Sequence, residues 1–356
     1  MTTPNATPHQ RRPRYAGKNP RRFEDKYKEH NPERYAADVA KVVAAGKTPA
    51  GSHRPIMVAE ILAVLALQPG EVAVDCTLGY GGHARELLCR VAPESAPLRG
   101  RLIGLDVDPV EHPRTTARLR AAGWGEGVFT PVRSNFAGLP KVLAELGLAG
   151  VDAILADLGV SSMQIDDPAR GFTFKADGPL DLRLNPARPP SAADWLARVT
   201  VADLATALTE NADEPKADQL ARELVARRTA TPFTRTRQFA DAIRDILNLP
   251  KPARGEEPDD TPVRRVFQAV RIAVNDEFGV LDLFLRNLPY ALKPGGRVAL
   301  LTFHSGEDRR VKAAFKVGLR AGLYSAISEE VIRAGVEELR ANPRSSSAKL
   351  RWAVRT

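Results

Sequence analysis

A glycine-rich segment, Asp75-Cys-Thr-Leu-Gly-Tyr-Gly-Gly-His83, constrains the fold of this chain more than any other part of it. It follows a short apolar run at residues 72–74 and precedes a helical pattern that begins at Ala84. Glycines at such a position let the backbone approach a ligand closely, and the free N–H groups of a helix start can bind it. The segment therefore predicts a strand, a tight turn and a helix beside a bound ligand.

A second apolar run ends at Asp106, in the segment Leu105-Asp-Val-Asp-Pro109. A carboxylate after the second strand of such a unit commonly binds the two hydroxyls of a ribose. Pro109 suits the first turn of a helix, so we expect Asp108 to cap that helix and Asp106 to face the ribose. These residues indicate an adenosine-type cofactor. A nicotinamide dinucleotide stays open at this point, because the glycines also fit the loose dinucleotide fingerprint.

Apolar runs alternate with helical patterns over much of the chain. This alternation predicts an α/β fold with a parallel, Rossmann-like sheet and right-handed crossovers. Strands are expected at residues 72–74, 102–105, 128–132, 151–156 and 297–302, the last after a turn at residues 293–296. Helices are expected between them, at residues 57–67, 115–122 and 139–146.

About 140 residues separate the strands expected at 151–156 and 297–302, more than a crossover needs. Capping boxes at Ser191 and Thr200 start helices there. Further helical patterns cover residues 218–227, 238–247 and 267–285, the last as one helix or two, with a polar loop at 251–261. We therefore expect an inserted helical domain at residues 165–285, between two segments of the sheet domain, 51–164 and 286–356.

The first 50 residues hold eleven Lys or Arg against five Asp or Glu, within a chain of formal net charge +9. We expect a basic, largely disordered extension there, which either binds a polyanion such as nucleic acid or only aids solubility. The two cysteines, Cys76 and Cys89, form no disulfide framework and no metal site. With no apolar run long enough for a membrane span and no signal-peptide core, we expect a cytoplasmic location.

Asp157 follows the strand expected at 151–156 and opens the segment Asp157-Leu-Gly-Val-Ser-Ser162. In a doubly wound sheet, ligands bind at the carboxyl ends of the strands. A carboxylate there can accept a hydrogen bond from an exocyclic amine or from the cofactor. The alternative is that Asp157 only caps the strand end.

A polar loop at residues 166–183 follows, and loops of this length commonly carry function. Phe172 and Phe174 either stack on a base or hold the loop to the core. Basic side chains at 264, 265, 271, 309, 310 and 312 either meet phosphates or lie on solvated helix faces. His304 follows the last expected strand and would face the same cleft, but a lone histidine is more often structural than catalytic, so its spacing alone does not make it a base.

Several motifs in the same order resemble the RsmH (MraW) family. They are Asp75–His83, Leu105–Pro109, Ser134-Asn-Phe136, Asp157-Leu-Gly-Val-Ser-Ser-Met-Gln164, Asp166-Asp-Pro-Ala-Arg-Gly-Phe172, Asp177-Gly-Pro-Leu-Asp-Leu-Arg183, Arg265-Val-Phe-Gln-Ala-Val-Arg-Ile272, Asn275-Asp-Glu277, Phe303-His-Ser-Gly-Glu-Asp308 and Asn342-Pro-Arg-Ser-Ser-Ser347. The resemblance implies a class I methyltransferase that transfers a methyl group from S-adenosylmethionine to the N4 of a cytidine in bacterial 16S rRNA, in the small-subunit decoding region. It also implies 16S rRNA or the small ribosomal subunit as partner.

The resemblance implies residue roles as well. Gly81, Gly82 and His83 would line the methionine side of the cofactor, and Asp106 would bind the ribose. Phe136 would lie near the adenine. Asp157 and Gln164 would complete the pocket near the reacting methyl. Our own hypothesis is that Asp157, as the catalytic residue, or a carbonyl near Gly159 accepts a hydrogen bond from the cytidine N4.

The chain departs from the family pattern at five places. Residues 54–60 replace a more aliphatic, acidic pattern, Gly306 stands where the family normally has Leu, and residues 211–215 differ from an expected Gly-Glu-Glu-type stretch. The segment after Phe315 is short, and the basic extension is not part of the pattern. Two other functions stay open from the sequence. One is a nicotinamide-dependent oxidoreductase, and the other is a non-catalytic RNA-binding protein with an inactive cofactor pocket.

Overall fold

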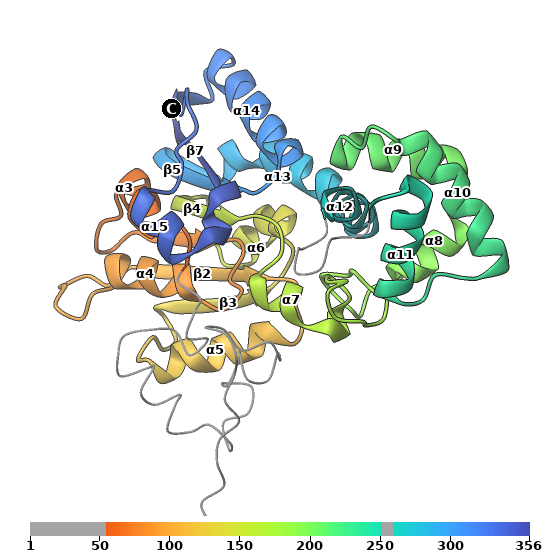
Figure 1. Cartoon of the computed structure of the whole chain (residues 1–356). Helices are drawn as coiled ribbons and strands as arrows, with labels where there is room; N and C mark the ends of the chain where they lie inside the picture. Colours follow the sequence, from red (N-terminus) through yellow and green to blue (C-terminus); the bar gives the residue numbers. More distant parts are fainter. Residues whose placement is uncertain (1–54, 251–258) are drawn as a thin grey trace, which may run out of the picture. The chain divides into compact units, whose positions relative to one another are not determined.

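The computed structural model describes residues 55–250 and 259–356 (Figure 1). The expected basic extension at 1–50 and most of the polar loop expected at 251–261 lie outside the described residues. None of the described helices is both long enough and apolar enough to span a bilayer.

Seven strands of the described chain form one sheet, in the order β3-β2-β1-β4-β5-β7-β6. Their bounds are β1 Val72–Asp75, β2 Arg101–Asp106, β3 Phe129–Arg133, β4 Val151–Asp157, β5 Leu292–Thr302, β6 Tyr324–Ile327 and β7 Lys349–Arg355. The first five pair in parallel, and β7 runs antiparallel to both of its neighbours. The predicted Rossmann-like sheet is confirmed. Its strand order reverses between β1 and β4, the place where such sheets bind ligands.

Alternating side chains of the strands face two separate layers of helices. On one face, Val74 and Ile103 belong to a core with residues of α6 (Leu139–Glu145), α13 (Glu277–Ala291) and α14 (Ser305–Arg320). On the other face, Ala73 and Leu102 belong to a core with residues of α3 (Val58–Leu65), α4 (Gly82–Val91) and α5 (Glu111–Ala121). Burial on both faces explains why these strands read as continuous apolar runs in the sequence.

A third core is built from helices and from residues of the loops between them, among them Leu180, Leu182 and Phe233. The helices are α8 (Ala192–Arg198), α9 (Val201–Ala212), α10 (Ala217–Ala230), α11 (Thr236–Leu247) and α12 (Thr261–Asn275), preceded by the short helices α7 (Ser162–Asp166) and η3 (Pro168–Arg170). The side chains of Ser191 and Thr200 accept hydrogen bonds from the third helical residues of α8 and α9, as the sequence predicts. Leu281 and Phe284 of α13 pack with the sheet. The domain boundaries at residues 165 and 285 stay a prediction.

Some elements differ from the sequence-based expectation. The residues expected to turn at 293–296 form a bulge inside β5, since Val151 pairs with Leu292 and Ala153 pairs with Arg297. Of the two alternatives for residues 267–285, the structure has two helices, which separate at Asp276 in the left-handed conformation. Strands β6 and β7, and the small helices α15 (Val336–Ala341) and η4 (Pro343–Ser347) between them, were not expected.

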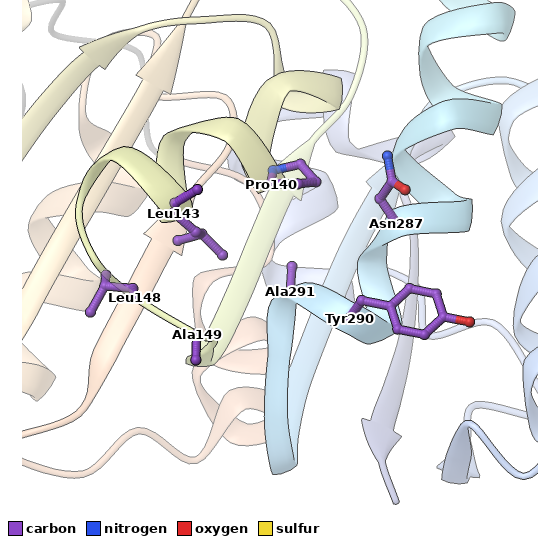
Figure 2. A pocket seen from close by; sticks show the side chains of 8 residues that line it. Pro140, Leu143, Leu148, Ala149, Asn287, Tyr290 and Ala291 are labelled. Carbon is purple, nitrogen blue, oxygen red and sulfur yellow. The ribbon is translucent and has the colours of Figure 1, made fainter.

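An apolar groove lies between α6 and α13 (Figure 2). Pro140 and Leu143 of α6 face Asn287 and Tyr290 of α13 across it, and the Tyr290 side chain is 64% exposed. Its lining also includes Leu148 and Ala149, shortly before β4, and Ala291, directly before β5. The groove is therefore at the amino ends of these strands, opposite the end where a Rossmann-like sheet binds its ligand.

Candidate functional site

The turn between β1 and α4 forms one side of the site. Gly81 has φ 74°, and a Cβ added to it would lie 2.8 Å from the Thr115 side chain, so a larger residue is excluded both by backbone conformation and by space. α4 then starts at Gly82 without a side-chain cap. The first N–H groups of α4 are thus left available to a ligand, as the sequence predicts.

Asp106, the last residue of β2, connects this turn to the next one. Its Oδ2 accepts a hydrogen bond from the Gly79 N–H at 2.7 Å, and its Oδ1 accepts one from the Asp108 N–H at 2.8 Å. Burial raises the pKa of Asp106. Each carboxylate oxygen keeps a further lone pair, so the side chain can still accept from a hydroxyl pair.

Asp108 caps the following helix, as expected from Pro109. Its Oδ1 accepts from the N–H groups of Val110 and Glu111, at 2.8 and 3.2 Å. Its Oδ2 accepts from Arg170 Nη1 at 2.7 Å, and this contact lowers the pKa of Asp108 against the effect of burial. Both oxygens of Asp108 are therefore occupied by the protein, and the ribose role of Asp106 stays a prediction.

Asp157, the last residue of β4, lies next to the β1–α4 turn. Its backbone N–H donates to Thr77 Oγ1 at 2.7 Å, and its Oδ2 lies 3.6 Å from Nδ1 of His83. Its Oδ1 is buried and has no hydrogen-bond partner in the described chain. Burial raises the pKa of Asp157 to about 7, with a contribution from the nearby Glu307. A strand-end cap would satisfy its oxygens, so this geometry does not fit the capping alternative.

Asp75, at the end of β1, is a site residue that sequence reasoning did not assign, although it starts the glycine motif. It is 1% exposed, and its Oδ2 has no hydrogen-bond partner among the described residues. Burial raises the pKa of Asp75 to about 6, and the nearby His83 acts in the opposite direction. The ends of β1, β2 and β4 therefore bring three carboxylates together, two of them with a buried unpartnered oxygen.

Phe136 and Gln164 lie at the edges of this group. Phe136 is half-buried, and its ring packs edge-on against Phe284 at 5.1 Å. The Gln164 side chain accepts from the Ser161 N–H at 2.9 Å and donates to Asp108 Oδ2 at 3.3 Å. The position of Gln164 is thus fixed by the first turn of α7 and by the β2 turn.

The two phenylalanines of the 166–183 loop pack with the helical core instead of facing outward. The ring of Phe174 lies 5.1 Å from that of Phe267, and Arg170 lies over Phe172 at 5.9 Å. The structure therefore favours their role in holding the loop to the core over the stacking of a base.

Most of the basic side chains that could meet phosphates have partners within the chain. Arg271 pairs with Glu277 at 2.7 Å, Arg309 with Asp213 at 3.1 Å, and Arg310 lies over the Phe278 ring at 3.8 Å. Arg264 and Lys312 are exposed. His304 caps α14 and contacts Glu307 at 3.2 Å, in keeping with a structural role.

A family model described as the MraW methylase family matches residues 50–356 of this chain. A protein named ribosomal RNA small subunit methyltransferase H 1 from Lachnoclostridium phytofermentans is 47% identical over 356 residues, which cover 99% of this chain and 95% of that protein. The protein of the same name from Agathobacter rectalis is 48% identical over 349 residues, 98% of each chain. The chain belongs to the MraW methylase family.

A SAM-dependent methyltransferase from Aquifex aeolicus, known from its crystal structure, is similar to this chain at a TM-score of 0.36 and 12% identity, over 85% of this chain and 90% of that one. Membership in the MraW methylase family favours a methyl donor over the nicotinamide dinucleotide that the glycines alone left open. The similarity to the Lachnoclostridium relative covers 99% of this chain, so it extends beyond residues 50–356, the segment that the family model matches.

One departure from the MraW methylase pattern has a structural reason. A Cβ added to Gly306 would lie 2.6 Å from the ring of Phe278 and 3.3 Å from His304 Nδ1. Phe278 also holds Arg310 against its face. A leucine at position 306 would therefore displace Phe278, so the glycine fits the aromatic residue opposite it.

Proposed function

We propose that this protein transfers a methyl group from S-adenosylmethionine to the N4 of a cytidine in bacterial 16S rRNA, in the decoding region of the small subunit. The observation that most supports the proposal is at Asp157, which lies at the ligand-binding end of the sheet and has a buried carboxylate oxygen without a partner in the described chain. Membership in a methylase family and the names of the relatives support the reaction and the class of substrate.

The residues at the strand ends fit this cofactor. Asp75 and Asp157 each have a buried oxygen without a partner in the described chain, and the Asp157 side chain as a whole is 28% exposed, so its carboxyl group can still meet a polar or cationic ligand. The site would hold S-adenosylmethionine through Gly81, Gly82, His83, Asp106, Phe136, Asp157 and Gln164. When bound, S-adenosylmethionine supplies a methyl group that its positively charged sulfur has already activated.

The task of the protein is to position the amine and to receive its proton. The lone pair of the cytidine N4 is delocalised into the ring, which makes it a poor nucleophile. A hydrogen bond from N4 to the carboxyl group of Asp157, whose side chain is 28% exposed, draws the lone pair out of conjugation. A carboxyl group whose pKa is near 7 is also suited to accept a proton at neutral pH. Alignment of the two reactants contributes the remaining acceleration.

The partner in this proposal is 16S rRNA or the small ribosomal subunit, and the helical region at 165–285 helps to receive it. The basic residues within 1–50 add contacts to phosphates, which need only positive charge. A cytoplasmic location stays a prediction.

The test is the variant Asp157→Asn, assayed for methyl transfer to small subunits and for cofactor affinity by calorimetry. We expect kcat to fall by roughly 10²- to 10⁴-fold, the range for loss of a proton acceptor, with a much smaller change in affinity. Asp152→Asn is the matched control, because Asp152 lies in the same strand at the opposite end, where it pairs with Lys293. Full turnover of Asp157→Asn would remove Asp157 from the mechanism.

The product is identified by mass spectrometry of small-subunit RNA from cells with and without the protein. A methyl group on the N4 of a cytidine in the decoding region is expected. A methyl group on another atom or in another RNA would contradict the proposed target, and the protein would then be a methylase of different specificity.

A further inference from the structure

Arg170 connects the turn after β2 to a loop of the helical region. Its side chain is 15% exposed, and its Nη1 donates to Oδ2 of Asp108 at 2.7 Å. Its Nη2 donates to the carbonyl oxygens of Arg183 and Leu184, at 3.2 and 2.9 Å. A guanidinium is planar and donates in fixed directions, so this side chain joins the carboxylate and the loop in one defined arrangement.

Asp108 is in turn attached to the residue expected to bind the ribose. Its backbone N–H donates to Oδ1 of Asp106 at 2.8 Å, and its side chain caps α5. The Asp108 side chain is 2% exposed, and a carboxylate buried to this degree needs a partner of opposite charge, which Arg170 supplies. A single residue therefore separates Arg170 from Asp106.

The loop that Arg170 contacts has a backbone conformation that needs support. Leu182 is 1% exposed and has φ 58°, in the left-handed region that is unfavourable for a residue with a Cβ. Its N–H donates to the carbonyl oxygen of Arg170 at 3.3 Å. On the other side of the loop, Asn275 of α12 accepts from the Leu184 N–H and donates to the Leu182 carbonyl oxygen, both at 2.8 Å. The loop at residues 182–184 is thus held between Arg170 and α12.

We propose that Arg170 is a positioning residue that docks the loop at 182–184, and α12 with it, onto the turn that contains Asp106. The cofactor and the small subunit then each bind more tightly when the other is bound. This inference rests on the proposed function, in which Asp106 binds the ribose and the helical region at 165–285 receives the subunit. Arg170 touches neither reactant in this arrangement and acts through the loop.

The coupling follows from a loop that is either docked on Arg170 or released from it. The Asp106 carboxylate is fixed when it accepts from the ribose hydroxyls, and its Oδ1 then holds the Asp108 N–H in place for Arg170. A subunit that binds the docked helical region favours the same form of the loop. Two ligands that favour one form raise the affinity for each other by the same factor.

Two lysine variants separate the docking of the loop from the neutralisation of Asp108. In Arg170→Lys, the ammonium group can still neutralise Asp108, but it lacks the planar fork that reaches the carboxylate and both carbonyl oxygens together. The matched control is Arg183→Lys in the same loop. The Arg183 side chain pairs with Asp181 at 2.6 Å and donates to the Arg188 carbonyl oxygen, so this control leaves the link to Asp108 intact.

The first measurement is the Kd of small ribosomal subunits for the full chain, with and without saturating S-adenosylhomocysteine, which has no methyl group to transfer. For the wild type, we expect subunits to bind at least about fivefold more tightly with this compound, the lower end of common coupling factors. The factor should fall toward one in Arg170→Lys and stay at the wild-type value in Arg183→Lys, whose two Kd values may rise together. A factor of one in the wild type, an unchanged factor in Arg170→Lys, or an equal fall in both variants overturns the inference.

Steady-state kinetics give a readout that a loss of folded protein would not change in the same way. A released loop lowers the apparent affinity for subunits, and saturating subunits restore the docked form. The KM of Arg170→Lys for small subunits should therefore rise by about 2- to 30-fold, the range for residues that couple two sites, with kcat close to the wild-type value. A lower kcat at unchanged KM would mean that Arg170 only stabilises the fold.

Failure of this inference can be told apart from failure of the proposed function. If the wild type transfers no methyl group to small subunits, the proposed function fails. If the wild type transfers the methyl group to the expected cytidine, and Arg170→Lys keeps the wild-type KM and coupling factor, only the role of Arg170 fails.

Discussion

The strand ends and the helical core treat buried charge in opposite ways. At the ends of β1 and β4, Asp75 and Asp157 each have a buried oxygen without a hydrogen-bond partner in the described chain. In the helical region, Arg244 pairs with Asp260 at 2.8 Å, and Arg271 pairs with Glu277 at 2.7 Å. The first arrangement lowers stability and raises carboxyl pKa values, and these two ion pairs avoid both effects. Glu214 is an exception in the helical region, because its buried Oε2 has no hydrogen-bond partner in the described chain and lies 3.7 Å from Arg265. The comparison separates a region organised for a ligand from one organised for packing.

The largest expected effect on stability is in the helical core. Phe239 is 0% exposed, and its ring lies 5.3 Å from those of both Phe233 and Phe267. Phe239→Ala should lower the free energy of unfolding by about 3–5 kcal/mol through lost burial and a cavity, as measured by denaturant titration. Val317→Ala, at a side chain that is 64% exposed, is the control and should change little. A loss below 1 kcal/mol for Phe239→Ala would mean that this core is loosely packed.

A smaller effect is expected at the ribose position, on binding more than on stability. Asp106→Ala should weaken S-adenosylmethionine binding by about 1–3 kcal/mol, the value of a hydrogen bond to a charged group. Because Asp106 also accepts from Gly79 and Asp108, Asp106→Asn is the matched variant that retains an acceptor oxygen. It should lose less affinity than Asp106→Ala. Calorimetry that finds wild-type affinity for both variants would place the ribose elsewhere.

The last prediction concerns the pH dependence of the free energy of unfolding, which we expect from the unpartnered carboxyl groups at the strand ends and not from the helical region. Burial raises the pKa of Asp75 to about 6 in the folded protein, so the folded state binds more protons than the unfolded chain between about pH 4 and pH 6. The free energy of unfolding should therefore fall as pH rises through this window. Asp75→Asn removes this fall, and its stability relative to the wild type should rise by about 1–3 kcal/mol from pH 4 to pH 7.

Unfolding of the cofactor-free protein at a series of pH values measures the effect. Asp245→Asn is the control, because the Asp245 side chain is 72% exposed and should give the pH dependence of the wild type. A pH dependence of Asp75→Asn that matches the wild type would show that Asp75 does not titrate in this window. The contrast between the two regions would then rest on Asp157 alone.

The sequence predicts the first five strands because each contains an apolar run, which in β1, β2 and β4 is largely buried on both faces, whereas the edge strand β3 is only partly buried. It does not predict β7, since Arg351 interrupts the apolar pattern in the middle of that strand. Arg351 is 4% exposed and is accepted there because Asp308 of α14 neutralises it at 2.6 Å. The pairing of Arg351 with Asp308 joins two elements that are distant in the sequence, so the residues around Arg351 give no sign of it. From the sequence pattern alone, β7 therefore looks like a surface segment.

The candidate site likewise has residues that the sequence predicts and residues whose role depends on contacts between distant parts of the chain. The glycine turn, Asp106 and Asp157 follow directly from strand ends and are visible in the sequence. Glu307 reaches Asp157 from a helix 150 positions further along the chain, and this proximity depends on the pairing of β4 with β5. Asp75 was within the motif, but its burial and its unpartnered oxygen become evident only when β2 and β4 pack on either side of β1.

The contact between Gly306 and Phe278 has a consequence for how this lineage can change. The two positions lie on consecutive helices, α13 and α14, and the space that a side chain at 306 would occupy is already filled by the aromatic ring. Each residue therefore restricts what can be inherited at the other. A mutation to leucine at 306 becomes harmless only after, or together with, a smaller residue at 278, so the two sites are expected to evolve as a pair.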